Sequence, residues 1–121
     1  MGCIITEKER TTLTFETFQE FCNSITKSND RCDNISYLAI AINEEAGEVA
    51  GHVKKMIRDD YCTLTDQRRL SILKECGDVM YYLGAMCHMI GFDLRDAAQS
   101  NMDKYQDRKA RGVLHGSGDD R

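Results

Sequence analysis

Five acidic residues stand at helical spacing in two short motifs of this chain. The first motif holds Glu44, Glu45 and Glu48, and the second holds Glu75 and Asp78. Residues three or four apart on a helix face the same way, with Cβ atoms about 5 to 6 Å apart, so each motif offers a pair of carboxylates. If the two helices that carry them pack antiparallel, the pairs face each other.

Both motifs interrupt apolar stripes, where unpaired carboxylates are poorly solvated and repel one another. A divalent cation would offset that repulsion. Hard oxygen ligands suit Mg²⁺, with Mn²⁺ as the alternative, better than Zn²⁺, which prefers His and Cys. Taken alone, the first motif reads more readily as solvated surface acids. The second acidic pair, on another amphipathic helix, is what favours a metal centre.

The elements that must position these acids are predicted to be helices. Apolar residues recur at steps of three and four, and capping or stop residues separate the periodic segments. The expected helices cover residues 14–28, 35–57, 66–90 and 93–108. The first motif falls on the second of these helices, and the second motif falls on the third.

The composition favours an all-α fold. The 121 residues contain no Pro, and 41% are hydrophobic and 30% charged, which is typical of a globular chain with long helices. We expect one domain over residues 1–121, a four-helix bundle with two long central helices, a loose arm (1–13) and a flexible glycine-containing tail (112–121). Because the central helices are apolar around much of their circumference, a homodimer or a dimer of dimers is expected.

Charge and cysteine content narrow the partners and the compartment. The formal net charge of -4 argues against binding to a nucleic-acid polymer. Six cysteines without a C-x-x-C pair indicate reduced thiols in the cytoplasm, and no segment is long and apolar enough for a membrane span. The first six residues fit a short myristoylation pattern, but that pattern often matches by chance, so no membrane partner is expected.

In combination, these motifs resemble those of the MazG-like, all-α nucleoside triphosphate pyrophosphohydrolases, which carry EExxE followed by ExxD. Residues 44–48 read EEAGE and, after 26 residues, residues 75–78 read ECGD. Residues 45–60 look like the second helix of the small, phage-type members, and residues 101–121 look like their C-terminal segment. The resemblance covers roughly residue 35 to the end.

The resemblance implies a Mg²⁺-dependent enzyme that cleaves a (deoxy)nucleoside triphosphate between the α and β phosphorus, giving a monophosphate and pyrophosphate. By position, it implies Glu45, Glu48, Glu75 and Asp78 as metal ligands and catalytic residues. Glu44 stays open as an extra ligand, a base for the attacking water or a surface acid. Cys76 replaces the usual apolar residue of the motif and is expected in the core.

The resemblance and the charge of a triphosphate together predict a substrate-binding set. Acids alone would repel the phosphates, so basic residues must complete the clamp. The set consists of Lys54, Tyr82, Asn101, Lys104 and Arg108. A solvated basic flank is the alternative for the three cations. For the tail, plain disorder and a lid over the phosphates, with Arg111 or Arg121, are equally favoured.

Two rival functions remain. A MazG-like bundle that has lost turnover would bind nucleotides as a regulatory partner, whereas a di-iron protein would use the same acids for oxygen chemistry. The di-iron alternative is disfavoured because the chain has no Glu-x-x-His pair. His52, four residues after Glu48, could reach a metal, but a packed or interfacial role is the preferred interpretation.

Overall fold

The computed structural model describes residues 12–27, 31 and 34–120. Its four labelled helices are α2 (Phe15–Lys27), α3 (Ile35–Asp59), α4 (Asp66–Met89) and α5 (Leu94–Ala110). None of the described residues lies in a strand, so the all-α prediction is confirmed for this part of the chain. Most of the expected N-terminal arm, together with Cys3, Cys32 and Arg121, lies outside the described residues.

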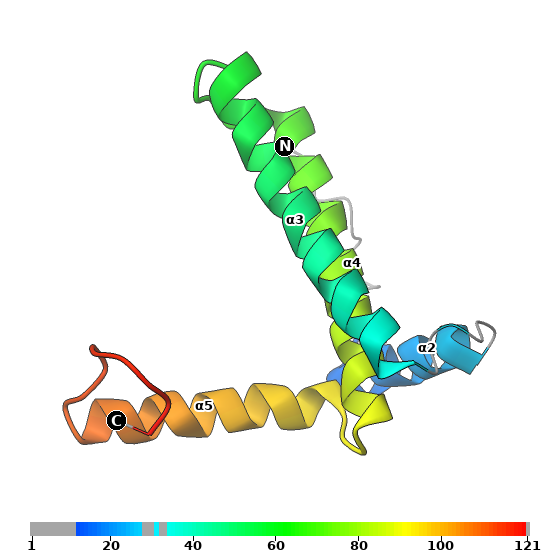
Figure 1. Ribbon diagram of the computed structural model, residues 1–121, viewed down its shortest axis with the longest axis vertical. Coiled ribbons are helices and arrows are strands. Elements are labelled where there is room, and N and C mark those ends of the chain that lie inside the picture. Colours follow the sequence, from blue (N-terminus) through cyan, green and yellow to red (C-terminus); the bar gives the residue numbers. More distant parts are fainter. Residues whose placement is uncertain (1–11, 28–30, 32–33, 121) are drawn as a thin grey trace.

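The two long helices, α3 and α4, form an antiparallel hairpin (Figure 1). Asn34 caps α3, because its Oδ1 accepts hydrogen bonds from the backbone N–H groups of Ser36 at 2.8 Å and Tyr37 at 3.3 Å. The Thr65 hydroxyl caps α4 by accepting from the Arg68 N–H at 3.2 Å. These caps fix where both helices begin.

Helix α2 packs against the last turns of α4, at the end of the hairpin opposite its tip. The close approach depends on Gly84, where an added Cβ would lie 2.9 Å from Cys22 Sγ. The buried Gln19 side chain donates to the Gly84 carbonyl at 3.0 Å and accepts from the Leu94 N–H at 2.8 Å. One amide therefore joins α2 to α4 and to the start of α5.

Helix α5 leaves this junction and runs away from the hairpin (Figure 1). Gly91, at φ 87°, ends the preceding helix in a conformation that favours glycine, and the Asp93 N–H donates to Asp96 Oδ2 at 2.9 Å as α5 begins. Beyond its first turns α5 contacts the chain's own C-terminal residues instead of the hairpin. The expected four-helix bundle is therefore not closed within one chain.

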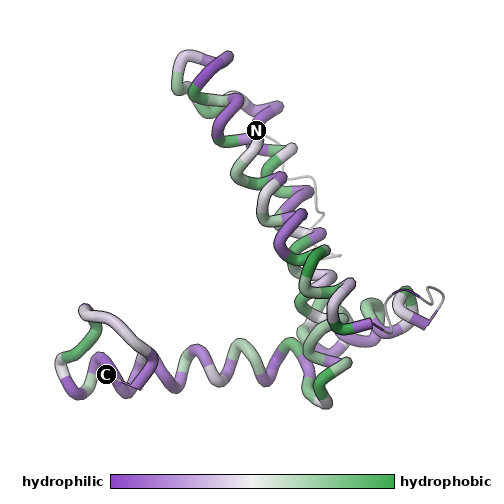
Figure 2. The backbone as a smooth tube through the Cα atoms, viewed as in Figure 1, coloured by the Kyte–Doolittle hydropathy of each residue, from purple (hydrophilic) through white to green (hydrophobic). Residues whose placement is uncertain are grey.

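The interior is small and sits near the base of the hairpin. Leu38 and Ala85 are its buried centre, and Tyr37, Tyr82, Met86 and Met89 pack around them. Figure 2 shows hydrophobic positions interspersed with hydrophilic ones along both long helices. Many apolar residues of the predicted stripes stay exposed. They include Val53, Ile57, Leu70, Leu73, Met80 and Leu83. Cys76 is also exposed, so its expected core position is wrong for the isolated chain.

Candidate metal centre

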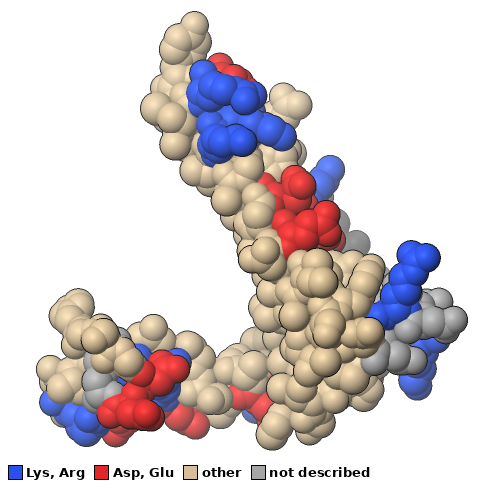
Figure 3. Space-filling view, viewed as in Figure 1, with Lys and Arg blue, Asp and Glu red and all other residues tan. Residues whose placement is uncertain are grey.

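The acidic residues of both motifs meet halfway along the hairpin. Single carboxylate oxygens of Glu45, Glu75 and Asp78 all lie within 4.8 Å of one another. A second group within the same distance joins Glu48, His52 and Glu75. Glu75 belongs to both groups, so it links the four predicted ligands into one cluster. Figure 3 shows acidic side chains gathered at this level of the hairpin, with basic side chains closer to its tip.

The cluster is only partly buried in one chain. Glu45 and Glu75 are half-buried, whereas Glu48 and Asp78 are exposed at its rim. Burial raises the pKa of the Glu45 carboxyl above its ordinary value, and the negative charges of Asp78, Glu44, Glu75 and Glu48 raise it further. Uncompensated negative charge has therefore accumulated around Glu45.

A divalent cation fits this donor set. The ligands are mainly carboxylate oxygens on two packed helices, which suits Mg²⁺ or Mn²⁺. A bound cation would favour the ionised form of Glu45, which its neighbours now disfavour. Because Glu48 and Asp78 are exposed, the cluster is open to solvent on their side.

Glu44 lies on the same turn as Glu45 but outside both groups of clustered donors. It is exposed, and one residue corresponds to about 100° around a helix, so it points to the flank of the site. Its charge still contributes to the raised pKa of Glu45.

His52 is the residue of the site whose contact was not expected. Its ring Nε2 lies 3.2 Å from Glu75 Oε1, and the two side chains are 16% and 21% exposed. Spacing alone places His52 on the face of Glu48. The contact with Glu75 also requires the register between α3 and α4, which the sequence pattern does not specify.

Two other predicted residues lie on the hairpin in different orientations. Tyr82 is one turn beyond Asp78 on the same face of α4, and it packs against the buried centre near Ala85. Lys54 is exposed and lies six residues after Glu48, about 240° around the helix, so it points away from the cluster. Lys55, seven residues after Glu48, lies on the acidic face of the helix, but the predicted substrate-binding set did not include it.

The remaining predicted residues lie on α5, away from the acids (Figure 1). Asn101 is exposed, and Lys104 Nζ lies 3.5 Å from Asp119 Oδ1. Arg108 is only 2% exposed, and its Nη2 donates to the Gly118 and Asp119 carbonyls at 3.2 and 2.7 Å. Within one chain, these cations hold the C-terminal residues and do not meet the acidic cluster.

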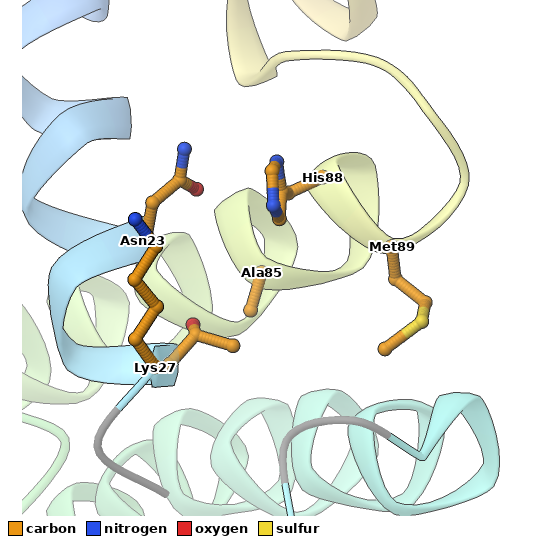
Figure 4. Close-up of a pocket in the computed structure, with 6 residues that line it drawn as sticks. Asn23, Lys27, Ala85, His88 and Met89 are labelled. Atoms are coloured by element: carbon orange, nitrogen blue, oxygen red, sulfur yellow. The ribbon is translucent and has the colours of Figure 1, made fainter.

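A cavity of about 270 Å³ lies between the ends of α2 and α4. Asn23 and Lys27 line it from α2, opposite Ala85, His88 and Met89 from α4 (Figure 4). Ala85 and Met89 continue, at steps of three and four residues, the face of α4 that carries the acidic pair and Tyr82. The near edge of the cavity at Ala85 therefore lies about 10 Å along the helix from Asp78, at 1.5 Å per residue.

None of the described helices combines the length and apolar character that a membrane crossing requires.

Comparison with known proteins identifies the family of the chain. Residues 33–113 match the MazG nucleotide pyrophosphohydrolase domain. The chain is also 39% identical over 92 residues to the Gene 37 protein of Mycobacterium phage L5, covering 76% of this chain and 81% of that protein. No solved structure gives a significant match. The match spans both acidic motifs and most of the chain, which therefore belongs to the MazG nucleotide pyrophosphohydrolase family.

Proposed function

We propose that the protein is a Mg²⁺-dependent nucleoside triphosphate pyrophosphohydrolase. Water would cleave a (d)NTP between the α and β phosphorus, giving a (d)NMP and pyrophosphate. The observation that carries the proposal is the convergence of two acidic motifs on Glu75 inside a MazG domain. The cytoplasm, where nucleotides occur with reduced thiols, is the proposed compartment; the four described cysteines are free.

Glu45, Glu48, Glu75 and Asp78 would hold the cation. When bound, Mg²⁺ neutralises triphosphate charge and orients the phosphates for displacement. The chain itself contributes rigid placement, because the four carboxylates come from two packed helices. The Glu44 carboxylate lies at the flank of the site, where it is suited to accept a proton from water.

The cavity beside Asn23 is the proposed site of the nucleoside. It lies on the face of α4 that leads from the acids past Tyr82, so a nucleotide with its phosphates at the cluster would extend toward it. The Asn23 Oδ1 accepts from Gln19 Nε2 at 2.9 Å, which orients the amide so that its NH₂ group can donate to a base edge. Ala85 and Met89 offer apolar surface.

The predicted substrate-binding residues on α5 are proposed to act in a neighbouring copy of the chain. Asn101, Lys104 and Arg108 do not reach the acids of their own hairpin, and large apolar side chains stay uncovered along both long helices. A homodimer or a dimer of dimers would cover those side chains and could bring α5 of one copy to the acids of the other.

The test is a panel of NTPs and dNTPs with Mg²⁺, in which pyrophosphate and orthophosphate are measured separately. We expect pyrophosphate with an equal amount of monophosphate, no orthophosphate, and no turnover after chelation. Glu48→Gln and Asp78→Asn should abolish turnover while helicity is unchanged. Tight nucleotide binding without release of pyrophosphate would instead support a regulatory protein that has lost turnover.

A further inference from the structure

A series of polar contacts runs from Glu75 away from the acidic cluster toward the hairpin tip. His52 Nε2 lies 3.2 Å from Glu75 Oε1, and Arg68 Nη1 lies 3.4 Å from His52 Nδ1. Arg68 Nε in turn donates to Asp60 Oδ2 at 3.0 Å. These contacts alternate between α4 and the α3 side of the hairpin, so they also join the two helices.

The chemistry of Arg68 fixes the direction of these hydrogen bonds. A guanidinium group donates but cannot accept, so His52 Nδ1 must accept from Arg68. The ring hydrogen then sits on Nε2, which donates to Glu75 Oε1. Arg68 is itself held by Asp60, and these two side chains are only 17% and 20% exposed. The tautomer of His52 is therefore set by a salt bridge on the side remote from the acids.

This arrangement engages one oxygen of the carboxylate that both donor groups share. Glu75 Oε1 accepts from His52, which leaves Oε2 free to turn toward a cation. Carboxylates that bind metals are commonly held by such outer hydrogen bonds, and loss of one weakens metal binding about 10- to 100-fold. No other described acid of the cluster has a hydrogen bond of this kind to a ring nitrogen.

We propose that His52 is a positioning residue that holds Glu75 for the metal, with Arg68 and Asp60 fixing the orientation of His52. The inference rests on the proposed metal centre. Direct coordination by His52 is the competing role, since Nε2 lies near Glu48 and Glu75. The hydrogen-bond direction opposes it, because the nitrogen that faces the acids carries the hydrogen and has no lone pair to offer.

The test is a Mn²⁺ titration of the full-length protein, followed by the EPR signal of free Mn²⁺. His52→Ala should weaken Mn²⁺ binding about 10- to 100-fold, and Arg68→Ala should weaken it by a smaller factor. His52→Gln, whose amide N–H replaces the ring N–H, should restore most of the affinity. Arg69→Ala is the matched control, because this substitution removes the same charge one residue away, at an exposed position.

Two spectroscopic measurements test the tautomer of His52 and whether His52 binds the metal directly. In the metal-free protein, ¹⁵N NMR of the imidazole should show hydrogen on Nε2, and Arg68→Ala should allow the other tautomer. Pulsed EPR of bound Mn²⁺ should show no directly coordinated ¹⁴N; such a nitrogen would overturn the positioning role.

The metal titration also separates a failure of the positioning role of His52 from a failure of the proposed metal centre. Unchanged Mn²⁺ affinity in a folded His52→Ala variant would overturn the positioning role and leave the proposed enzyme intact. Wild-type protein that binds no Mn²⁺ would instead overturn the proposed metal centre, and the positioning role with it.

Discussion

Glu44 and Glu75 belong to the first and the second acidic motif, and their surroundings differ. Glu75 is half-buried and shared by both groups of donors, whereas Glu44 is exposed and belongs to neither. Helical spacing alone could not rank them, whereas the family resemblance already left the role of Glu44 open. The structure adds the physical reason, because the antiparallel register of the hairpin brings Glu75 between Glu45 and Glu48.

That difference predicts opposite effects on metal binding. Glu75→Gln removes a charged oxygen from both donor groups, so Mn²⁺ binding should be lost at the concentrations that saturate wild type. Turnover should be abolished with it, as in Glu48→Gln and Asp78→Asn. Glu44→Gln makes the same chemical change at the flank and should keep the Mn²⁺ affinity near that of wild type. Equal losses in the two variants, measured by the same titration, would contradict this ranking.

The raised pKa of Glu45 predicts a pH-dependent stability for the metal-free protein. A carboxyl whose pKa is higher in the folded chain than in the unfolded chain favours folding when it is protonated. That contribution is complete below the ordinary Glu pKa and is lost as the pH rises through the raised value. The unfolding midpoint of wild type should therefore fall, relative to that of Glu45→Gln, as the pH rises above the ordinary Glu pKa and through the raised value.

Saturating Mg²⁺ supplies the control for this experiment. A bound cation favours the ionised carboxylate, so at neutral pH it should raise the midpoint of wild type more than that of Glu45→Gln. Parallel pH profiles of the two proteins without metal would show that the charges of the cluster do not disfavour ionised Glu45.

Among the elements, the helices were predictable because local signals define them. The observed helices begin within about two residues of the predicted starts, where Thr14, Asn34, Thr65 and Asp93 precede them. The direction of α5 was not predictable. It is set by the contacts of Gln19 and by the turn at Gly91, which join residues far apart in the sequence and leave no local periodicity.

The C-terminal residues contact α5 within one chain, because Arg108 and Lys104 hold Asp119. Those ion pairs lower the pKa of the Asp119 carboxyl, with the Arg108 hydrogen bond as the main cause. A phosphate that reached these two cations would compete with the Asp119 carboxylate. A flexible tail and a lid over the phosphates of a neighbouring copy both stay predictions.

The packing of α2 on α4 makes Gly84 sensitive to substitution. In Gly84→Ala the new Cβ would lie 2.9 Å from Cys22 Sγ, so the buried Cys22 side chain or the helices that carry the two residues must shift. The free energy of unfolding should fall by about 1 to 3 kcal/mol. Gly47→Ala is the matched control, because its Cβ meets no described atom within 4 Å and it should gain up to about 1 kcal/mol of helix stability.

Urea unfolding at one fixed protein concentration measures both variants. Equal stability of Gly84→Ala and wild type would contradict the close approach of α2. A loss of stability in Gly47→Ala would mean that the outer side of α3 is covered by another copy in solution.

At the scale of the whole molecule, the chain is an open arrangement with its acids on one arm and its proposed phosphate-binding cations on another (Figure 1). The sequence predicted a bundle because amphipathic helices must bury their apolar faces. In one chain that burial is incomplete, which leaves Ile57, Leu73 and Met80 exposed by 57%, 54% and 45%. The contacts that would complete it lie between copies, where a single sequence carries no register information.

If neighbouring copies complete each other's sites, two inactive variants should restore activity when they assemble together. Glu75→Gln disables the acids, and the double variant Asn101→Ala/Lys104→Ala disables the α5 side. In a mixed dimer, one site combines both defects, whereas the other combines intact acids from the double variant with an intact α5 from the Glu75→Gln chain.

Random assembly makes half of the dimers mixed, so refolding an equimolar mixture should recover about one quarter of wild-type pyrophosphate release. Each variant refolded alone is the control. If acids and cations instead acted within one chain, every site in the mixture would keep one defect, and activity would equal the mean of the two variants.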